Sequence, residues 1–393
     1  MDTVIIKIYG PHKFQITSRS WFLPEISTRK FHELSPTEKQ SERLFLRRFI
    51  FQPPYTDTYL PKIEIFETLN KDRTNVVYVL KSEFSVPKLV HGNSLQEVSG
   101  VDLERVLYTF KKSLAGVGIL IESDTVANAR VSAAHFCKNI PLPASIRIQE
   151  ILDELMRVDI SKVVDITKTE FKKGGRVLHI YSGTIERVFY DKVSDAMRPK
   201  IKRKDKGRIA RERGIIERHK LENREVFRYE YRIKKAQTVM RDINAALGRE
   251  PKTYVAFKDL FEPGLCKAML LKSWRDLIQR PENQLALIGP SDELGLLLHI
   301  ISETKKQNGK AHSMNNALVS YGLACAIRDH GAKEVRRVIF EGWNTDHSER
   351  FTRKIQTAAE LTKGLPYSNS VAYVDKALED FHLITLASLE YGI

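Results

Sequence analysis

Hydrophobic and polar residues alternate along several short stretches in the first two thirds of the chain. A period of two, together with β-branched and aromatic residues, is typical of strands that bury one face. We therefore expect strands at residues 3–9, 63–66, 76–86, 119–121, 128–137, 176–181 and 225–234, and a further strand that follows a turn at 182–184 and ends at Tyr190.

Two segments between these stretches have the apolar spacing of helices instead. The first begins after Asp102, a residue type common at helix N-caps, and ends at Gly116. Its apolar stripe consists of Leu103, Val106, Leu107, Phe110 and Leu114, and that of the second helix consists of Ile148, Ile151, Leu152, Leu155 and Met156. Strands with helices packed between them predict an α+β fold with a central antiparallel sheet.

From about residue 252 onward, helical patterns dominate. Ser313 can cap a helix that ends at Gly331, and residues 332–340 can form a second helix after this tight turn. The apolar face expected for the first of these helices is Met314, Leu318, Tyr321 and Cys325. The spacing is that of a DNA-reading helix-turn-helix, but two helices joined by a glycine also occur as plain packing, so both interpretations stay open.

The chain has 393 residues, of which 42% are hydrophobic, and this is enough for two domains with separate cores. We expect an α+β domain at 1–250 and a helical domain at 251–393. No stretch approaches twenty uninterrupted apolar residues, and the first residues run directly into a strand, so we expect a protein that is neither exported nor membrane-spanning. Three widely spaced cysteines argue against a disulfide framework and indicate a reduced, cytoplasmic protein.

A net charge of +15 points to a polyanionic partner, and nucleic acid is the simplest one. The charge is concentrated in residues 198–213, where nine lysines and arginines face two acidic residues, and we name residues 198–224 the basic segment. The alternative is a solvated loop or exposed helix. If the segment instead clamps DNA phosphates, its contact residues are Lys202, Arg203, Lys204, Lys206 and Arg208.

Tyr190 and Lys192 are the most informative pair for chemistry. On a strand, residues two apart point to the same face, so we expect the phenol and the ammonium to be neighbours. A tyrosine whose phenolate is favoured by a nearby cation is a candidate nucleophile for phosphate chemistry. Tyr181 competes for this role, although it lacks a lysine two residues later and a glycine turn follows it.

The strand at 128–137 offers a candidate metal site. Alternation places His135 and Cys137 on one face, although a thiolate suits softer metals than Mg²⁺ or Mn²⁺, so Cys137 can also be only a filler and His135 a structural residue. Glu83 and Glu230 lie on other expected strands and can supply hard oxygen ligands. Glu230 shares a face with Arg228 and Arg232, so an ion-pair ladder on an exposed sheet face is an equal alternative.

Four motifs in this order resemble the gene II family of rolling-circle replication initiators, which are HUH endonucleases of filamentous phages and related plasmids. The motifs are Glu83-Phe84-Ser85-Val86-Pro87-Lys88-Leu89-Val90-His91-Gly92-Asn93, Ala134-His135-Phe136-Cys137-Lys138-Asn139, Val188-Phe189-Tyr190-Asp191-Lys192 and Phe227-Arg228-Tyr229-Glu230-Tyr231-Arg232. The resemblance covers residues 76–235 and extends only loosely to the helical part. The second histidine of the family pattern is Cys137 here.

The resemblance implies an HUH-type nuclease domain with a central antiparallel sheet, in which Mg²⁺ or Mn²⁺ positions the scissile phosphate. Tyr190 would be the nucleophile, Lys192 would stabilise the developing charge, and His135 would be a metal ligand. The enzyme would nick one strand of a single-stranded or supercoiled origin, keep a 5′-phosphotyrosyl bond, leave a free 3′-OH and later rejoin the strand. DNA is then a partner, contacted also by Arg228 and Arg232, and a host polymerase and helicase are expected in the cytoplasm of the host cell.

Our leading hypothesis is therefore a metal-dependent DNA nicking and joining enzyme that initiates rolling-circle replication. One rival is a non-catalytic DNA-binding initiator or repressor with the same fold, which the cysteine at position 137 favours. Another is an HUH transposase, which would use the same chemistry on transposon ends.

Overall fold

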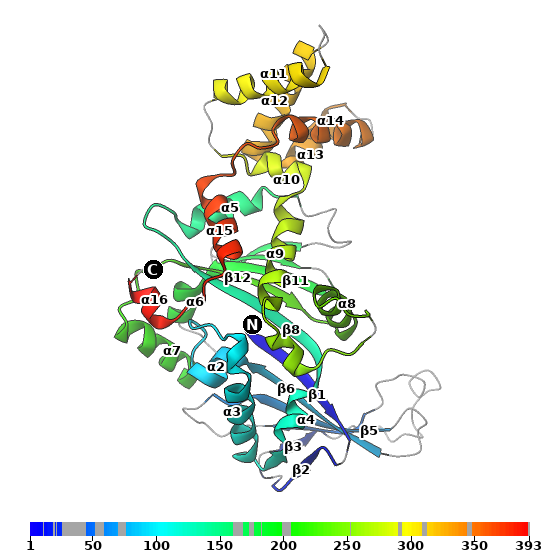
Figure 1. Cartoon of the computed structure of the whole chain (residues 1–393), viewed down its shortest axis with the longest axis vertical. Helices are drawn as coiled ribbons and strands as arrows, with labels where there is room; N and C mark the ends of the chain where they lie inside the picture. Colours follow the sequence, from blue (N-terminus) through cyan, green and yellow to red (C-terminus); the bar gives the residue numbers. More distant parts are fainter. Residues whose placement is uncertain are drawn as a thin grey trace.

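The computed structural model of the chain has an α+β architecture built on one large antiparallel sheet, as the alternating patterns predict (Figure 1). It describes residues 1–10, 12–18, 20, 22–25, 45–51, 59–69, 76–159, 168–172, 177–181, 183–198, 206–251, 253–289, 293–308, 313–343 and 348–391.

Ten strands form the large sheet. Their order across it is β3 (Phe22–Glu25), β4 (Phe45–Phe51), β5 (Lys62–Leu69), β6 (Val76–Ser85), β1 (Thr3–Tyr9), β8 (Arg130–Pro141), β12 (Val226–Ile233), β11 (Ile185–Asp191), β10 (Val177–Tyr181) and β9 (Lys168–Lys172). Short strands β2 (Phe14–Ile16) and β7 (Ile119–Ile121) form a separate pair. Each strand expected from the sequence is present, with ends that shift by a few residues.

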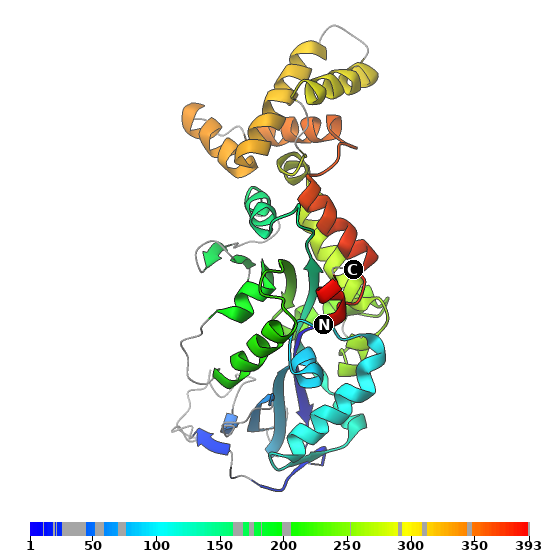
Figure 2. The same ribbon diagram turned by 90° about the vertical axis from the view of Figure 1, so that its left-hand side faces the viewer.

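Helices cover both faces of the sheet (Figure 2). One face carries α3 (Leu103–Ala115), α9 (Leu265–Ile278) and α15 (Asn369–Asp380), and the other carries α6 (Lys192–Met197) and α7 (Lys206–Arg218). The remaining elements around the sheet are α2 (Val86–His91), η2 (Gly100–Asp102), α4 (Ser123–Ala127), α5 (Ile148–Met156), α8 (Ala236–Ala246), η4 (Phe257–Phe261) and α16 (Leu386–Tyr391).

The face under α3 and α9 is the apolar core. The predicted stripe of α3 is confirmed, since Val106, Leu107, Phe110 and Leu114 are buried. The ring of Phe110 lies 4.5 Å from that of Phe84 on β6. Farther along the sheet, Phe189 and Tyr229 stack with ring centroids 4.8 Å apart under Trp274 of α9. Burial of these large side chains fixes which face of each strand is covered.

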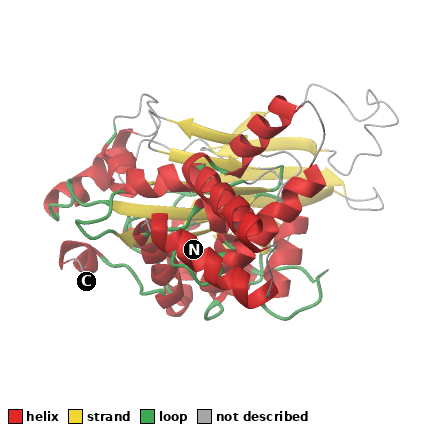
Figure 3. Ribbon diagram, turned by 90° about the horizontal axis from the view of Figure 1, so that it is seen from above, coloured by secondary structure: helices red, strands yellow, loops and turns green. Residues whose placement is uncertain are grey.

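A second, smaller core belongs to a helical unit at one end of the molecule (Figure 1). It contains α10 (Pro281–Ala286), α11 (Glu293–Asn308), α12 (Ser313–His330), α13 (Ala332–Trp343) and α14 (Ser348–Leu361). Seen along the long axis from this end, these helices lie in front of the strands (Figure 3). The unit is shorter than the domain expected at 251–393, because α9 and α15 on either side of it pack into the core of the sheet.

The two helices expected around Gly331 are present as α12 and α13, but the apolar face expected for the first is only half confirmed: Tyr321 and Cys325 pack against the core of the helical unit, and the other two residues do not. Met314 is 69% exposed and Leu318 is 49% exposed, whereas Ala317, Ala324 and Ile327 are buried. Small residues allow close packing of helices, so the buried face is set by the alanines and not by the largest apolar side chains.

No helix in the described part of the chain combines the length and the apolar character needed to cross a lipid bilayer.

Candidate functional site

Polar side chains from four adjacent strands share the face of the sheet that lies under α6 and α7. Paired residues of antiparallel strands point to the same side, so the register defines rows across the sheet. In the order β10, β11, β12, β8, three successive rows are Tyr181, Glu186, Arg232 and His135; His179, Val188, Glu230 and Cys137; and Val177, Tyr190, Arg228 and Asn139. We call this surface the polar face.

Tyr190 lies deep in the polar face and is only 9% exposed. Its phenol donates a hydrogen bond of 2.6 Å to Oε1 of Glu230. Burial, and next the Glu230 carboxylate, raise the pKa of Tyr190 well above its ordinary value. Tyr190, the expected nucleophile, is therefore protonated, uses its hydroxyl hydrogen in the bond to Glu230 and is shielded from solvent.

Glu230 is the centre of an ion-pair ladder, as one of the two interpretations of the sequence predicted. Its Oε1 accepts from Nε of Arg228 at 2.7 Å and its Oε2 accepts from Nε of Arg232 at 2.7 Å. Burial opposes ionisation, but the two guanidinium groups outweigh it and hold the pKa of Glu230 below its ordinary value. The ladder differs from the expected one because it is buried, not exposed.

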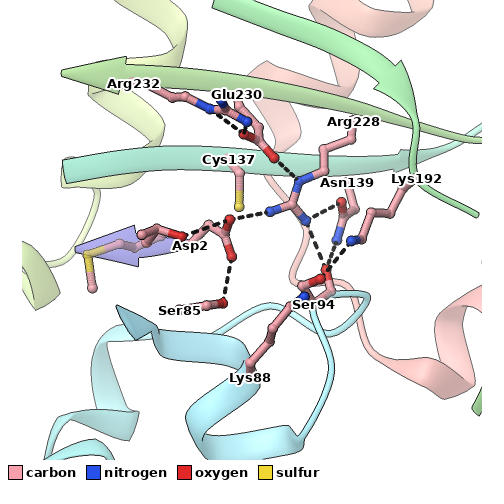
Figure 4. A network of polar contacts seen from close by, with 12 residues as sticks. Asp2, Ser85, Lys88, Ser94, Cys137, Asn139, Lys192, Arg228, Glu230 and Arg232 are labelled. Carbon is pink, nitrogen blue, oxygen red and sulfur yellow. Dashed lines mark hydrogen bonds and ion pairs between the residues drawn. The ribbon is translucent and has the colours of Figure 1, made fainter. Parts of the chain in front are cut away.

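Arg228 is completely enclosed and cannot contact DNA as expected, since it is 1% exposed. Figure 4 shows its guanidinium between four partners. Besides Glu230, Nη2 lies 3.0 Å from Oδ2 of Asp2, and Nη1 donates to the Ser94 carbonyl at 2.8 Å and to Oδ1 of Asn139 at 3.0 Å. Arg232 is less buried but also ion-paired, so both arginines hold the polar face together.

Lys192 is not a strand residue, which corrects the expected alternation with Tyr190. Strand β11 ends at Asp191, whose Oδ1 accepts the backbone N–H groups of Val193 and Ser194 at 3.0 and 3.1 Å. This cap begins α6 at Lys192. The Lys192 ammonium is buried and donates to Oγ of Ser94 at 2.6 Å, so it is joined to Tyr190 through Ser94, Arg228 and Glu230.

The structure does not bring Glu83 next to Tyr190. Glu83 is on the same side of the sheet as His135, but it forms an ion pair of 2.7 Å with Lys62. Four strand spacings separate β6 from β11, which puts Glu83 about 19 Å from Tyr190 across the sheet. These positions do not provide the joint site that the sequence suggested.

Cys137 and Glu230 are the other candidate metal ligands. Burial raises the pKa of the Cys137 thiol to about 12, and sulfur is in any case a poor ligand for Mg²⁺ or Mn²⁺. Both oxygens of Glu230 are held by arginines. Among the residues that the structure describes, no three histidine, cysteine, aspartate or glutamate side chains are grouped to hold a metal ion. The described residues therefore do not group into a ligand set, and the divalent metal stays a prediction.

Tyr181 lies at the other end of the polar face and is half-buried. Its ring is 4.9 Å from that of His179, and Nε2 of His179 is 3.4 Å from Oε2 of Glu186. Glu186 also pairs with Lys234 and, at 3.4 Å, with Nη1 of Arg232. This cluster combines a tyrosine, an imidazole and two cations.

The sequence interpretation missed His179 and Glu186. The signal was present, because the turn at 182–184 sets the register of the hairpin and brings residues 181 and 186 opposite each other. It also missed Asp2 and Glu212, whose positions beside the polar face depend on contacts between segments far apart in the chain.

The basic segment is only partly described. Lys202, Arg203 and Lys204 lie outside the described residues, and for Lys206 and Arg208 the structure gives only the backbone of α7. Helix α7 places the end of the segment next to the polar face, against α6 (Figure 2). Its role in DNA binding stays a prediction.

Comparisons with models of known protein families, with curated proteins and with solved structures give no match for this chain.

Proposed function

We propose that the chain nicks and rejoins one strand of DNA through a tyrosine nucleophile and so initiates rolling-circle replication. The observation that carries this proposal is the cluster at the end of the polar face, where a half-buried Tyr181 lies beside His179 and in one row with Glu186 and Arg232. The net charge of +15 and the basic segment support DNA as the substrate.

The geometry favours Tyr181 over Tyr190 as the nucleophile. An attacking phenol must reach the phosphorus atom and lose its proton. Tyr190 is 9% exposed, and its hydroxyl donates a hydrogen bond to Glu230. Tyr181, in contrast, is half-buried and lies at the end of a hairpin strand. The motif around Tyr190 then has a positioning role, since it anchors the carboxylate that holds Arg232.

In the proposed reaction, the Tyr181 oxygen forms a bond to phosphorus while the bond from phosphorus to the 3′ oxygen breaks. The phenolic proton passes to His179, whose Nε2 lies 3.4 Å from Oε2 of Glu186, and the departing 3′ oxygen takes up a proton from water. Arg232 and Lys234 lie where they can stabilise negative charge on the phosphate. The phosphotyrosyl bond conserves the energy of the phosphodiester, so rejoining needs no nucleotide. A divalent metal stays a prediction, and no step here depends on one.

The test is covalent capture of DNA. The protein is incubated with single-stranded DNA of random sequence that carries a label at its 3′ end, because a 5′-phosphotyrosyl bond retains the 3′ fragment. Labelled protein on a denaturing gel is the readout. We expect Tyr181→Phe to abolish the adduct with binding nearly intact and Tyr190→Phe to keep it. Adducts that persist in Tyr181→Phe and vanish in Tyr190→Phe would return the role to Tyr190.

A second candidate function is a DNA-binding initiator or repressor without nicking activity. The specific observation in its favour is that Glu83, Glu186 and Glu230 are each ion-paired to lysine or arginine. DNA binding without any covalent adduct from the wild-type protein, in Mg²⁺ or Mn²⁺, would support this candidate and count against the first.

A further inference from the structure

Four donor groups converge on one carboxylate next to the polar face. The carboxylate is that of Glu212 on α7. Its Oε1 accepts from the backbone N–H of Ser94 at 2.9 Å and from Oγ of Ser94 at 2.6 Å, and lies 3.9 Å from Nζ of Lys192. Its Oε2 accepts from Nζ of Lys88 at 3.0 Å. Figure 4 shows Lys88 and Lys192 approaching Ser94 from opposite sides.

Two of the three donor residues are buried, and the contacts around Ser94 hold its backbone in place. Ser94 and Lys192 are 2% and 5% exposed. The Ser94 carbonyl accepts from Arg228 and Asn139, and the Asn93 side chain accepts the N–H groups of Leu95 and Gln96. The Ser94 hydroxyl and N–H are therefore fixed in direction before any anion is bound, which lowers the entropy cost of binding one.

Two ammonium groups, from Lys88 and Lys192, face the carboxylate of Glu212. The nearby charge of Arg228 is already matched by Asp2 and Glu230. Burial opposes ionisation of Glu212, but the lysines outweigh it and hold its pKa well below the ordinary range. The position thus favours a bound anion over a neutral group.

The donors and the carboxylate come from different parts of the structure. Lys88, Ser94 and Lys192 belong to α2, the loop after it and the start of α6, which all attach to the sheet. Glu212 arrives on α7, a helix within the basic segment. Because Ile216 keeps α7 packed against Val193 of α6, the Glu212 carboxylate would leave this site by rotation of its side chain and not by movement of the helix.

We propose that Lys88, Ser94 and Lys192 form a binding site for a phosphate group, and that Glu212 occupies it in the absence of ligand. Two ammonium groups, a hydroxyl and a backbone N–H are the donors that phosphate-binding sites use. A phosphate would exchange with the Glu212 side chain, while α7 stays packed against α6 through Ile216 and Val193. The site does not require that the protein nick DNA.

The first experiment measures thermal unfolding of Glu212→Gln in sodium phosphate and in sodium chloride of equal ionic strength. The variant removes the negative charge that lies between the ammonium groups of Lys88 and Lys192, so it should unfold at lower temperature in chloride. At phosphate tenfold above its Kd, we expect a rise in Tm of about 2–4 °C. The wild-type protein and Glu217→Gln, which changes an exposed glutamate of the same helix, should respond much less.

Glu212→Asp covers the case in which Glu212→Gln does not fold. It keeps the negative charge but shortens the side chain, so it should fold and exchange with phosphate more readily than the wild type. Adding Lys192→Met to either variant should remove the phosphate response. If neither variant is stabilised by phosphate more than Glu217→Gln is, the proposal is overturned.

The second experiment identifies the source of the phosphate. Binding of a short single-stranded DNA with a 5′-phosphate is compared with binding of the same DNA without it. A preference for the phosphorylated DNA that grows in Glu212→Asp indicates a terminal phosphate, and equal strengthening of both indicates a backbone phosphate. No strengthening of either, together with stabilisation by inorganic phosphate, limits the site to the free ion. These outcomes do not depend on covalent adducts, so failure here and failure of the proposed nicking function are distinguishable.

Discussion

The phenolic oxygen of Tyr190 and Oε1 of Glu230 lie 2.6 Å apart across two neighbouring strands, β11 and β12. The same carboxylate accepts from Arg228 and Arg232. One tyrosine therefore completes the hydrogen bonding of a buried carboxylate at the centre of the sheet. This relationship explains why the motif around Tyr190 can be essential to the fold without carrying the nucleophile.

Tyr190→Phe should destabilise the protein. The change removes only the hydroxyl and leaves a buried, charged carboxylate with one donor fewer, which costs about 1.5–3 kcal/mol for a hydrogen bond to a charged group. Urea denaturation followed by circular dichroism measures the free energy of unfolding. Tyr108→Phe, at an exposed position of α3, is the matched control and should change it little. Equal stability of wild type and Tyr190→Phe would contradict the role of this hydrogen bond.

The pattern of the sequence predicted part of the elements of the fold, but not strands β3, β4 and β9 or helices α6, α7, α9 and α15. Alternation predicted β1 at residues 3–9, and the apolar spacing after Asp102 predicted α3, because both elements bury one regular face against the core. Such patterns describe one segment at a time. They do not say which strands become neighbours, so the rows of the polar face become known only from the strand pairing in the structure.

The site was harder to predict for the same reason. Arg228, Glu230 and Arg232 were expected to share a face, and they do, but whether that face is covered depends on α6 and α7. Asp2 contacts Arg228 although the two residues lie far apart in the sequence. The end of β11 was missed because the capping carboxylate of Asp191 stops the strand one residue before Lys192.

Stability should fall with acid in a window set by His135. Burial, and next the charge of Arg232, lower the pKa of His135 to about 4, against partial compensation by Glu230, Asp2 and Glu83. The unfolded chain takes up this proton near pH 6.5 and the folded one only near pH 4, so stability is full above pH 6.5 and is lost as the pH falls between these values. The full loss is at most about 3 kcal/mol.

Denaturant unfolding at a series of pH values from 7.5 to about 4 tests this expectation. His135→Gln should flatten the curve between pH 6.5 and 4, because glutamine does not titrate. His330→Gln serves as the control, since this histidine is in the last turn of α12, away from the polar face. A slope that is the same in wild type and in His135→Gln would assign the acid sensitivity to other groups.

Neutralising the basic segment should weaken DNA binding on all sequences. For every phosphate that the variant no longer neutralises, the slope of log K against log salt should fall by about 0.7 on single strands, because fewer counterions are released. The variant replaces Lys202, Arg203, Lys204 and Lys206 by glutamine. A control with the same change in net charge replaces Lys112, Lys258, Lys272 and Lys376, which are exposed on other elements. Weaker binding to one DNA sequence alone would mean that the segment reads bases.

Gly331 connects α12 to α13 and should tolerate no side chain. Its φ of 80° lies in the left-handed region, where an alanine costs about 1–2 kcal/mol. A Cβ atom would also lie 2.6 Å from the carbonyl oxygen of Arg157, at the end of α5, so the helical unit would have to shift away from the sheet. We expect Gly331→Ala to lower the melting temperature and to weaken the contact between the helical unit and the end of α5.

Gly322→Ala provides the opposite result in the same helix. Gly322 lies inside α12, where a Cβ atom would meet nothing within 4 Å. Alanine restricts the unfolded chain more than glycine does, so this variant should gain about 0.5–1 kcal/mol. Differential scanning calorimetry of both variants compares the two effects directly. Equal stability of Gly331→Ala and Gly322→Ala would contradict this expectation. The close approach of Gly331 to Arg157 would then not hold the helical unit in place, and the two cores would unfold independently of this contact.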